Sequence, residues 1–158
     1  MNSWKCYILK AVDNSNRTYV GATPDVLRRL DDHNGINKNR GARATRGRWW
    51  EVAIIVTGFE TKRACLAFES AVRRIRRYKK RRLHTPSTHK SPISKRVVDL
   101  FNVIDRGHRV HAWTSLKLHF IEMNAAHYAH LLENTHNMEL SDIERNTGVT
   151  WVFDIDHL

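Results

Sequence analysis

The chain has 158 residues, 41% of them apolar, which fits one domain or one domain with a small appendage. It has two cysteines, no signal-peptide-like start and no apolar run of bilayer length, so a reducing, intracellular compartment is expected rather than secretion or a membrane. The formal charge of +11 favours a polyanionic partner, and nucleic acid is the commonest polyanion.

The charge is unevenly distributed along the chain. Residues 1–119 carry 26 Lys and Arg against 9 Asp and Glu, a net charge of +17, whereas residues 120–158 carry one Arg against 7 acids, a net charge of −6. Two interpretations stay open. The acidic end could be a separate functional segment, or it could pack on the basic body and neutralise it.

Two strands are predicted over residues 4–12 and 17–22, and the turn-forming cluster at residues 13–16 indicates that they pair as a β-hairpin. A helix is expected to follow. Thr23 supplies a capping hydroxyl, Pro24 suits the first helical position, and Asp25 complements the helix dipole. Asn34 and Gly35 mark the end of this helix.

Residues 36–48 are predicted to form a loop rich in glycine, asparagine and basic side chains. The nearly uninterrupted apolar run over residues 49–57 predicts a central strand that is buried on both faces. Thr61 is expected to cap a long helix, whose apolar positions recur at helical spacing as far as Ile75 and which runs on into basic residues up to 82.

The second half of the chain gives weaker patterns. After a Ser-, Thr- and His-rich linker over residues 84–92, a helix is predicted over 93–104 and a strand or extended segment over 113–121. A further helix is predicted over 124–133, and the remainder has no clear pattern.

We therefore expect an α/β fold with a small mixed, partly antiparallel three-stranded sheet flanked by helices. Residues 1–83 would form the principal domain. Residues 93–158 would form a mostly helical C-terminal extension, packed on or beside that domain.

Five side chains of the principal domain could carry chemistry. Tyr7 and Tyr19 lie on the two strands of the hairpin, which can bring them to one face. Arg29 and His33 are spaced i, i+4 on the first helix and so share one side of it. Glu69 lies at the edge of the apolar stripe of the long helix, where a carboxylate needs a partner, and a metal ion is one.

This combination suits phosphodiester hydrolysis. A carboxylate can hold Mg²⁺, arginine can bind a phosphate that gains charge in the transition state, and tyrosine or histidine can move the proton of the attacking water. Each residue also has a structural interpretation. Strand tyrosines are usually sheet residues, Arg29 could join a solvated charge ladder with Asp32, and Glu69 could pair with Arg73. The helix dipole alone favours His33 near a helix C-terminus.

Several motifs follow one another at fixed intervals. In chain order they are Lys5-Cys6-Tyr7-Ile8-Leu9, Tyr19-Val20-Gly21, Arg28-Arg29-Leu30, His33-Asn34-Gly35, Gly41-Ala42, Thr45-Arg46, Arg48-Trp49-Trp50-Glu51, Gly58-Phe59 and Ala67-Phe68-Glu69. As an ordered set they resemble the GIY-YIG nuclease family, in particular its Slx1 branch. The resemblance is dense over residues 4 to about 80 and continues weakly over 113–120.

The resemblance implies a GIY-YIG nuclease fold for residues 1–83 and DNA hydrolysis that leaves 5′-phosphate and 3′-hydroxyl ends. It implies that Tyr7 is the general base or positions the attacking water. It also implies that Tyr19 helps to position the nucleophile and the scissile phosphate. Gly21, which closes the second motif, would let the backbone approach closely.

The same resemblance implies a catalytic arginine on the first helix. We expect it to be Arg29 rather than Arg28, because Arg29 shares a face with His33, whereas Arg28 lies about 100° around the helix. Glu69 matches the family's single metal-binding carboxylate. The expected cofactor is Mg²⁺, with Mn²⁺ as a substitute.

Members of the Slx1 branch carry a C-terminal RING-type zinc domain that docks an Slx4-type scaffold. Both cysteines of this chain lie in its first half, so we expect neither that domain nor a structural zinc, although His108-x-x-His111 and His127-x-x-His130 have ligand-like spacing. Dependence on an Slx4-type scaffold is therefore doubtful. Residues 122–158 could serve a homodimer or another partner.

Basic side chains flank the expected site and are expected to contact DNA phosphates without reading sequence. They are Lys38, Arg40, Arg43, Arg46, Arg48, Arg73, Arg76 and Arg77. The basic run over residues 76–82 could equally be a nuclear localisation tract. No helix-turn-helix or zinc-finger pattern is present to read base edges, which favours recognition of DNA shape.

Together these features predict a structure-selective endonuclease that cuts branched DNA, such as flaps, forks and Holliday-type junctions. Its expected place is the nucleus or a viral DNA replication compartment, in repair, recombination or viral DNA processing. Two alternatives stay open: a sequence-specific GIY-YIG nuclease of the homing or restriction type, and a non-catalytic DNA-binding module.

Overall fold

The computed structural model describes residues 3–13, 16–38, 40–82, 92–110, 113, 115–121, 145 and 150–152. Within these residues five strands form one sheet in the order β2-β1-β3-β4-β5. The strands are β1 (Lys5–Ala11), β2 (Thr18–Thr23), β3 (Trp50–Thr57), β4 (Lys117–Phe120) and β5 (Thr150–Val152). Neighbouring strands run antiparallel except β4 and β5, which are parallel.

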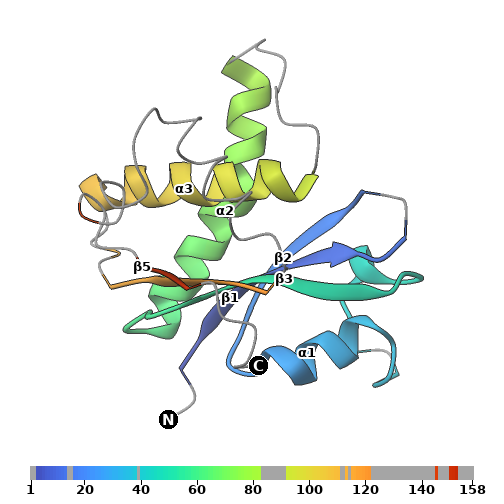
Figure 1. Cartoon of the computed structure of the whole chain (residues 1–158). Coiled ribbons are helices and arrows are strands. Elements are labelled where there is room, and N and C mark those ends of the chain that lie inside the picture. Colours follow the sequence, from blue (N-terminus) through green and yellow to red (C-terminus); the bar gives the residue numbers. More distant parts are fainter. Residues whose placement is uncertain are drawn as a thin grey trace.

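The sheet separates two helical layers (Figure 1). Helix α1 (Val26–His33) lies on one face, and helices α2 (Lys62–Arg82) and α3 (Pro92–Val110) lie on the other. A short 3-10 turn, η1 (Arg43–Thr45), lies in the loop between α1 and β3. None of the helices in the described ranges is long and apolar enough to cross a membrane.

Each face of the sheet has its own apolar core, because successive strand residues point to opposite sides. Cys6 and Ile8 of β1 enter the larger core, which includes Phe68 of α2 and Leu100 of α3. Tyr7 and Leu9 enter the smaller core beside α1, together with Val26, Trp50, Val52 and Ile55. The first candidate tyrosine is therefore part of the packing on the α1 side.

The predicted hairpin is confirmed, and the register of its ladder matters for the site. Tyr7 lies opposite Gly21, and Leu9 lies opposite Tyr19. The backbone N–H of Ala11 donates to the carbonyl of Arg17 at 2.9 Å, which closes the hairpin. This register places Tyr7 and Tyr19 diagonally on the same face.

The expectation that Thr23 caps the first helix is wrong. Thr23 is still the last residue of β2, and Asp25 is the N-cap, accepting a hydrogen bond from the backbone N–H of Arg28 at 3.1 Å. Thr23 instead accepts from the N–H of Asp25 at 3.2 Å. The cap of α2 is as predicted, since the Thr61 hydroxyl accepts from the N–H of Ala64 at 3.1 Å.

Helix α3 ends later than the predicted residue 104. It begins at Pro92, which suits a first helical position, and runs to Val110 through Gly107. The ring of Trp113 lies against the Cα of Gly107, in the space that a side chain there would occupy. This packing against a buried tryptophan explains why a glycine is kept inside the helix.

The α/β class is confirmed, but the sheet is larger than the three strands expected. The segment over residues 113–121, expected to be a strand or extended, supplies β4, which pairs with β3 from Ile54 to Thr57. A fifth strand then pairs with β4. Helix α3 and β4 share the larger core with β1 and α2. The predicted linker, apart from Pro92, and the helix predicted over 124–133 lie outside the described residues.

Candidate functional site

Three aromatic rings meet where the hairpin and α1 come together. Tyr7 comes from β1, Tyr19 from β2 and His33 from the last turn of α1. The ring centroids of Tyr19 and His33 are 4.8 Å apart, those of Tyr7 and His33 are 5.9 Å apart, and those of the two tyrosines are 6.4 Å apart. The structure therefore brings three of the five predicted residues together.

A buried hydrogen-bonded chain passes through His33. The Tyr7 hydroxyl lies 2.7 Å from His33 Nε2, and His33 Nδ1 lies 2.8 Å from the Thr45 hydroxyl. Tyr7, His33 and Thr45 are 1%, 3% and 0% exposed, so bulk water does not satisfy these polar groups. Both ring nitrogens of His33 are thus engaged by side chains of the protein.

Burial keeps both partners of the first hydrogen bond neutral at ordinary pH. Desolvation raises the pKa of Tyr7, and the neighbouring Tyr19 raises it further, while Arg29 acts in the opposite direction. Desolvation lowers the pKa of His33 to about 4, with a further contribution from the positive charge of Arg29 and opposition from Asp32. Neutral imidazole and neutral phenol are therefore the forms that face each other.

Arg29 lies beside the ring cluster and is held by its own helix and by the loop that follows it. Its guanidinium donates to the Asp32 carboxylate at 3.3 Å and to the backbone carbonyl of Arg40 at 2.9 Å. It also interacts with the Tyr7 hydroxyl, where each group's charge affects the other's pKa. The side chain is 31% exposed, so it is only partly covered by the protein.

The ion pair between Arg29 and Asp32 is also the contact that a purely structural role for Arg29 would give. Asp32 is buried and also accepts from Asn37 at 2.9 Å, so it fixes the guanidinium rather than leaving it in a solvated ladder. Arg28, by contrast, is exposed. Between the two arginines, Arg29 is the one that the fold places against the tyrosines.

Glu69 comes from α2, in the layer opposite α1 (Figure 1). Its carboxylate accepts from the Arg73 guanidinium at 3.1 Å, and its side chain is only 13% exposed. The Cys6 thiol, next to Tyr7 in β1, has its pKa raised by burial, by Cys65 and by Glu69, in that order. Glu69 thus lies near the start of β1, and the alternative pairing with Arg73 is present.

Glu69 fits a hard divalent cation better than a soft one. It offers carboxylate oxygens, which Mg²⁺ prefers, and an ion held by one carboxylate completes its shell with water and phosphate. In the part of the chain that the structure describes, no group of three or more His, Cys, Asp or Glu side chains could hold a metal ion.

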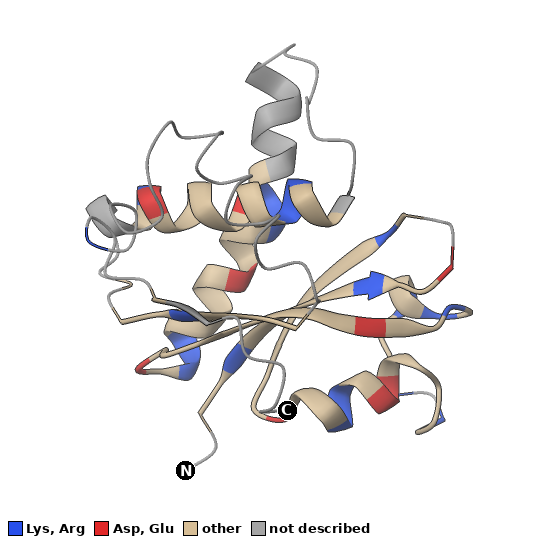
Figure 2. Cartoon of the chain, viewed as in Figure 1, with Lys and Arg blue, Asp and Glu red and all other residues tan. Residues whose placement is uncertain are grey.

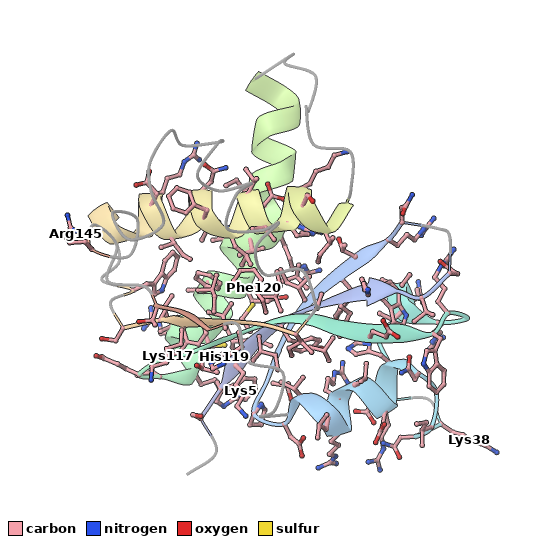
Figure 3. The ribbon with its side chains drawn as sticks, viewed as in Figure 1. Lys5, Lys38, Lys117, His119, Phe120 and Arg145 are labelled. Carbon is pink, nitrogen blue, oxygen red and sulfur yellow. The ribbon has the colours of Figure 1, made fainter. Side chains whose placement is uncertain are left out.

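The predicted DNA-contact residues of the loop are mostly exposed. Lys38, Arg40, Arg43 and Arg46 are open to solvent, and the side chain of Lys38 extends away from the body of the protein (Figure 3). Arg48 is partly buried and pairs with Asp13 at 3.3 Å.

Arg73, predicted on α2, is 59% exposed and pairs with Glu69. The side chains of Arg76 and Arg77, and of the four histidines with ligand-like spacing, lie outside the described part. Basic residues lie both on the α1 side of the sheet and in the first turns of α2, as the blue segments in Figure 2 show. Positive charge is therefore available on both sides of the sheet.

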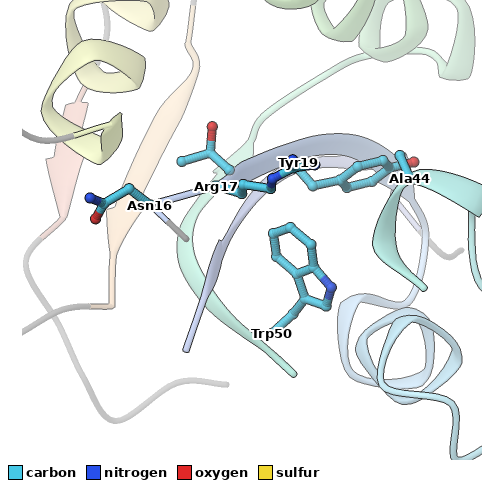
Figure 4. Close-up of a pocket in the computed structure, with 6 residues that line it drawn as sticks. Asn16, Arg17, Tyr19, Ala44 and Trp50 are labelled. Atoms are coloured by element: carbon cyan, nitrogen blue, oxygen red, sulfur yellow. The ribbon is translucent and has the colours of Figure 1, made fainter. Parts of the chain in front are cut away.

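An open pocket of about 350 Å³ adjoins the ring cluster (Figure 4). It is lined by Asn16, Arg17, Thr18, Tyr19, Ala44 and Trp50. Tyr19 lines this pocket and also packs on His33, so its ring lies between the pocket and the candidate site.

Sequence reasoning did not assign roles to two residues that support the site. Thr45 binds His33, and Asn34 brackets Trp50, accepting from its backbone N–H at 2.7 Å and donating to its carbonyl at 3.1 Å. Both residues belong to the motifs that carry the resemblance, and that was the signal in the sequence. Their partners depend on the path of the loop, which no periodic pattern predicts.

A small α/β domain with two hairpin tyrosines, a helix arginine and a lone helix carboxylate has the organisation of a nuclease catalytic domain. A family model described as the GIY-YIG catalytic domain matches residues 3–84. The chain belongs to the GIY-YIG family.

The relatives of this chain include fungal proteins named as Slx1 endonuclease subunits. The chain is 47% identical over 76 residues to the uncharacterized protein L300 of Acanthamoeba polyphaga mimivirus, covering 48% of this chain and 45% of that protein. It is 51% identical over 70 residues to the structure-specific endonuclease subunit SLX1 of Cryptococcus neoformans, covering 43% of this chain and 14% of that protein. With the slx1 subunit of Botryotinia fuckeliana it shares 48% identity over 68 residues, 42% of this chain and 16% of the relative. The matched segment accounts for less than half the length of each relative.

Proposed function

We propose that this chain is a Mg²⁺-dependent endonuclease that hydrolyses phosphodiester bonds in branched DNA. The observation that carries the proposal is the buried hydrogen bond between Tyr7 and His33, with Tyr19 and Arg29 beside it. A neutral tyrosine paired with a neutral histidine can take a proton from water and pass one on.

The proton of the attacking water is handled by Tyr7 and His33. As the hydroxyl of Tyr7 takes a proton from water, its own proton passes to His33, and the hydroxide left behind forms a bond to phosphorus. The bond between phosphorus and the 3′-oxygen then breaks, and that oxygen takes a proton from solvent. The products carry 5′-phosphate and 3′-hydroxyl ends.

The phosphate is held mainly by Arg29. A guanidinium can donate to two phosphate oxygens, and Asp32 and the carbonyl of Arg40 fix the orientation of this one. Tyr19 lies between the pocket and His33, where it can position the nucleotide next to the scissile bond. Holding both reactants in one geometry supplies a large part of the rate enhancement of an enzyme.

Glu69 would hold the metal ion. Mg²⁺ bound there supplies Lewis-acid stabilisation of the developing negative charge, and Mn²⁺ is expected to replace it. The Arg73 side chain that now pairs with Glu69 is largely exposed and could turn to a DNA phosphate instead.

The preference for branched DNA draws on two supports. The fungal relatives are named structure-specific endonuclease subunits. The exposed basic residues around the site suit phosphate contacts that do not read sequence. We place this activity in DNA repair and recombination or in viral DNA processing, in the nucleus or in a viral replication compartment.

The test compares purified chain on labelled linear duplex, flap, fork and four-way-junction DNA at equal salt, with Mg²⁺, Mn²⁺ or a chelator. We expect branched substrates to be cut faster than linear duplex with either metal. Tyr7→Phe, Arg29→Ala and Glu69→Gln should each lower kcat by about 100-fold or more, with DNA binding followed separately by fluorescence anisotropy.

Each other outcome has a defined meaning. DNA binding by the wild-type chain without cutting in either metal would contradict the proposal and favour a non-catalytic binding module. Cuts restricted to one sequence in linear duplex would favour the homing or restriction type. Cutting by the chain alone would also show that no scaffold subunit is needed.

A further inference from the structure

Thr45 holds an unusual position for a loop residue. It ends the η1 turn, is 0% exposed, and lies 2.8 Å from Nδ1 of His33 on the side away from Tyr7. A buried hydroxyl with one proton must commit that proton to one acceptor. The acceptor of this proton determines which ring nitrogen of His33 is protonated, and so whether Nε2 can accept a hydrogen bond from Tyr7.

The hydroxyl of Thr45 donates to the backbone carbonyl of Ala42 at 2.8 Å. A carbonyl oxygen can only accept, so this contact uses the single hydroxyl proton of Thr45. The hydroxyl oxygen is then left as an acceptor at His33, and His33 Nδ1 must carry the proton that it receives. In neutral imidazole the other nitrogen, Nε2, is therefore without a proton.

The loop holds Thr45 in this orientation from the other side. The carbonyl of Thr45 accepts from the indole N–H of Trp50 at 2.9 Å, and the backbone N–H of Thr45 donates to Ala42 at 3.0 Å. Trp50 is itself 2% exposed and is bracketed by Asn34, the residue next to His33. The hydroxyl therefore has little freedom to turn and donate to His33 instead.

We propose that Thr45 is a positioning residue that fixes His33 as the Nδ1-protonated tautomer, so that the Nε2 lone pair accepts the hydrogen bond of the Tyr7 hydroxyl. The catalytic consequence rests on the proposed function. With this tautomer the proton of Tyr7 has a vacant acceptor, and a water proton can replace it on the phenol oxygen. With the opposite tautomer an Nε2–H group would point at the Tyr7 oxygen, and the transfer would be blocked.

The first arm of the test measures the tautomer without any substrate. Long-range ¹H–¹⁵N correlation spectra of the histidine side chains report which ring nitrogen carries the proton, and His33→Gln identifies the His33 signals. Near pH 7 the wild-type chain should show His33 protonated at Nδ1 and unprotonated at Nε2. The opposite pattern in the folded wild-type chain would overturn the proposal whatever the activity.

The second arm compares variants. Thr45→Ala should give mixed or reversed His33 tautomers and lower kcat by about 10-fold or more, with KM nearly unchanged. Thr45→Ser keeps the hydroxyl and should restore both the wild-type tautomer and kcat. Thr57→Ala is a matched control, because Thr57 and His119 form a second threonine–histidine hydrogen bond, 3.0 Å long, which involves neither Tyr7 nor His33.

The two arms separate the inference from the proposed function. An unchanged His33 tautomer in folded Thr45→Ala, or an equal loss of kcat in Thr57→Ala, would overturn the positioning role. If Thr45→Ala does not fold, the wild-type spectrum and the Thr45→Ser variant still decide. The expected tautomer in a chain that cuts no DNA would sink the proposed function and leave the tautomer assignment in place.

Discussion

Gly21 lies directly opposite Tyr7 in the β1–β2 ladder, and the phenol ring of Tyr7 occupies the space that a side chain at position 21 would need. The ring therefore crosses the neighbouring strand and reaches His33 with its hydroxyl. A glycine in the second motif is explained by this crossing. It allows a side chain, rather than a substrate, to approach the backbone closely.

The first prediction is that Gly21→Ala disturbs the hydroxyl of Tyr7. The added methyl group would displace the ring and lengthen the hydrogen bond to His33. We expect kcat to fall by about 10-fold or more, since small misplacements in an active site are costly. Overpacking should cost about 1–3 kcal/mol of stability, measured by urea unfolding. Wild-type kcat in the folded variant would show that the position of this ring does not matter.

Much of the fold followed from local patterns. The hairpin, the first two helices and the buried third strand each had a clear periodicity or end signal, and the structure has them. Strands β4 and β5 were harder to predict, because residues 117–120 and 150–152 are short segments. Their pairing depends on tertiary contacts with residues far away along the chain. A short segment joins a sheet for reasons that its own sequence does not contain.

The site was predictable to the extent that its residues lie on regular elements. The spacing of Arg29 and His33, and the hairpin geometry of Tyr7 and Tyr19, followed from helix and strand periods. The role of Thr45 did not, because it reaches His33 only through the path of the loop, 12 residues further along the chain.

The second prediction concerns the ion pair between Glu69 and Arg73. Arg73 competes with a cation for the carboxylate, so Arg73→Ala should lower the Mg²⁺ concentration that gives half-maximal cleavage by several-fold. Arg74, next to it on α2 and also exposed, provides a control, since Arg74→Ala leaves the ion pair intact. The same metal shift in both variants would mean that general surface charge, and not this contact, is responsible.

The third prediction concerns the loop residues Arg40, Arg43 and Arg46. Each phosphate that a variant leaves without its arginine should reduce the slope of log binding constant against log salt concentration by about 0.9 for duplex arms. We expect single alanine variants to weaken binding of branched and linear DNA alike, measured by anisotropy across a salt series. Arg106→Ala, an exposed position on α3, should leave the slope unchanged. An unchanged slope in all three loop variants would mean that these arginines do not contact DNA phosphates.

The fourth prediction is that His33 makes the stability of the protein depend on pH. Its pKa is lowered to about 4, mainly by burial and also by Arg29, with Asp32 opposing. Between pH 4 and 6.5 the unfolded chain therefore binds a proton at this residue that the folded chain does not, so stability rises with pH through this window. The contribution is complete above about pH 6.5 and amounts to about 3 kcal/mol at most.

The measurement is urea unfolding at several pH values between 4.5 and 7.5. His33→Gln should flatten the pH dependence of the free energy of unfolding in this window. His119 also has its pKa lowered, by burial and then by Lys117 and Lys5, so His119→Gln is a necessary comparison. Figure 3 shows His119 together with those two lysines, and β3 separates its strand from the strand of Tyr7. Because His119 is less buried than His33, its replacement should flatten the curve less. Equal flattening by both replacements would mean that burial and Arg29 hold His33 in its neutral form no more strongly than His119 is held.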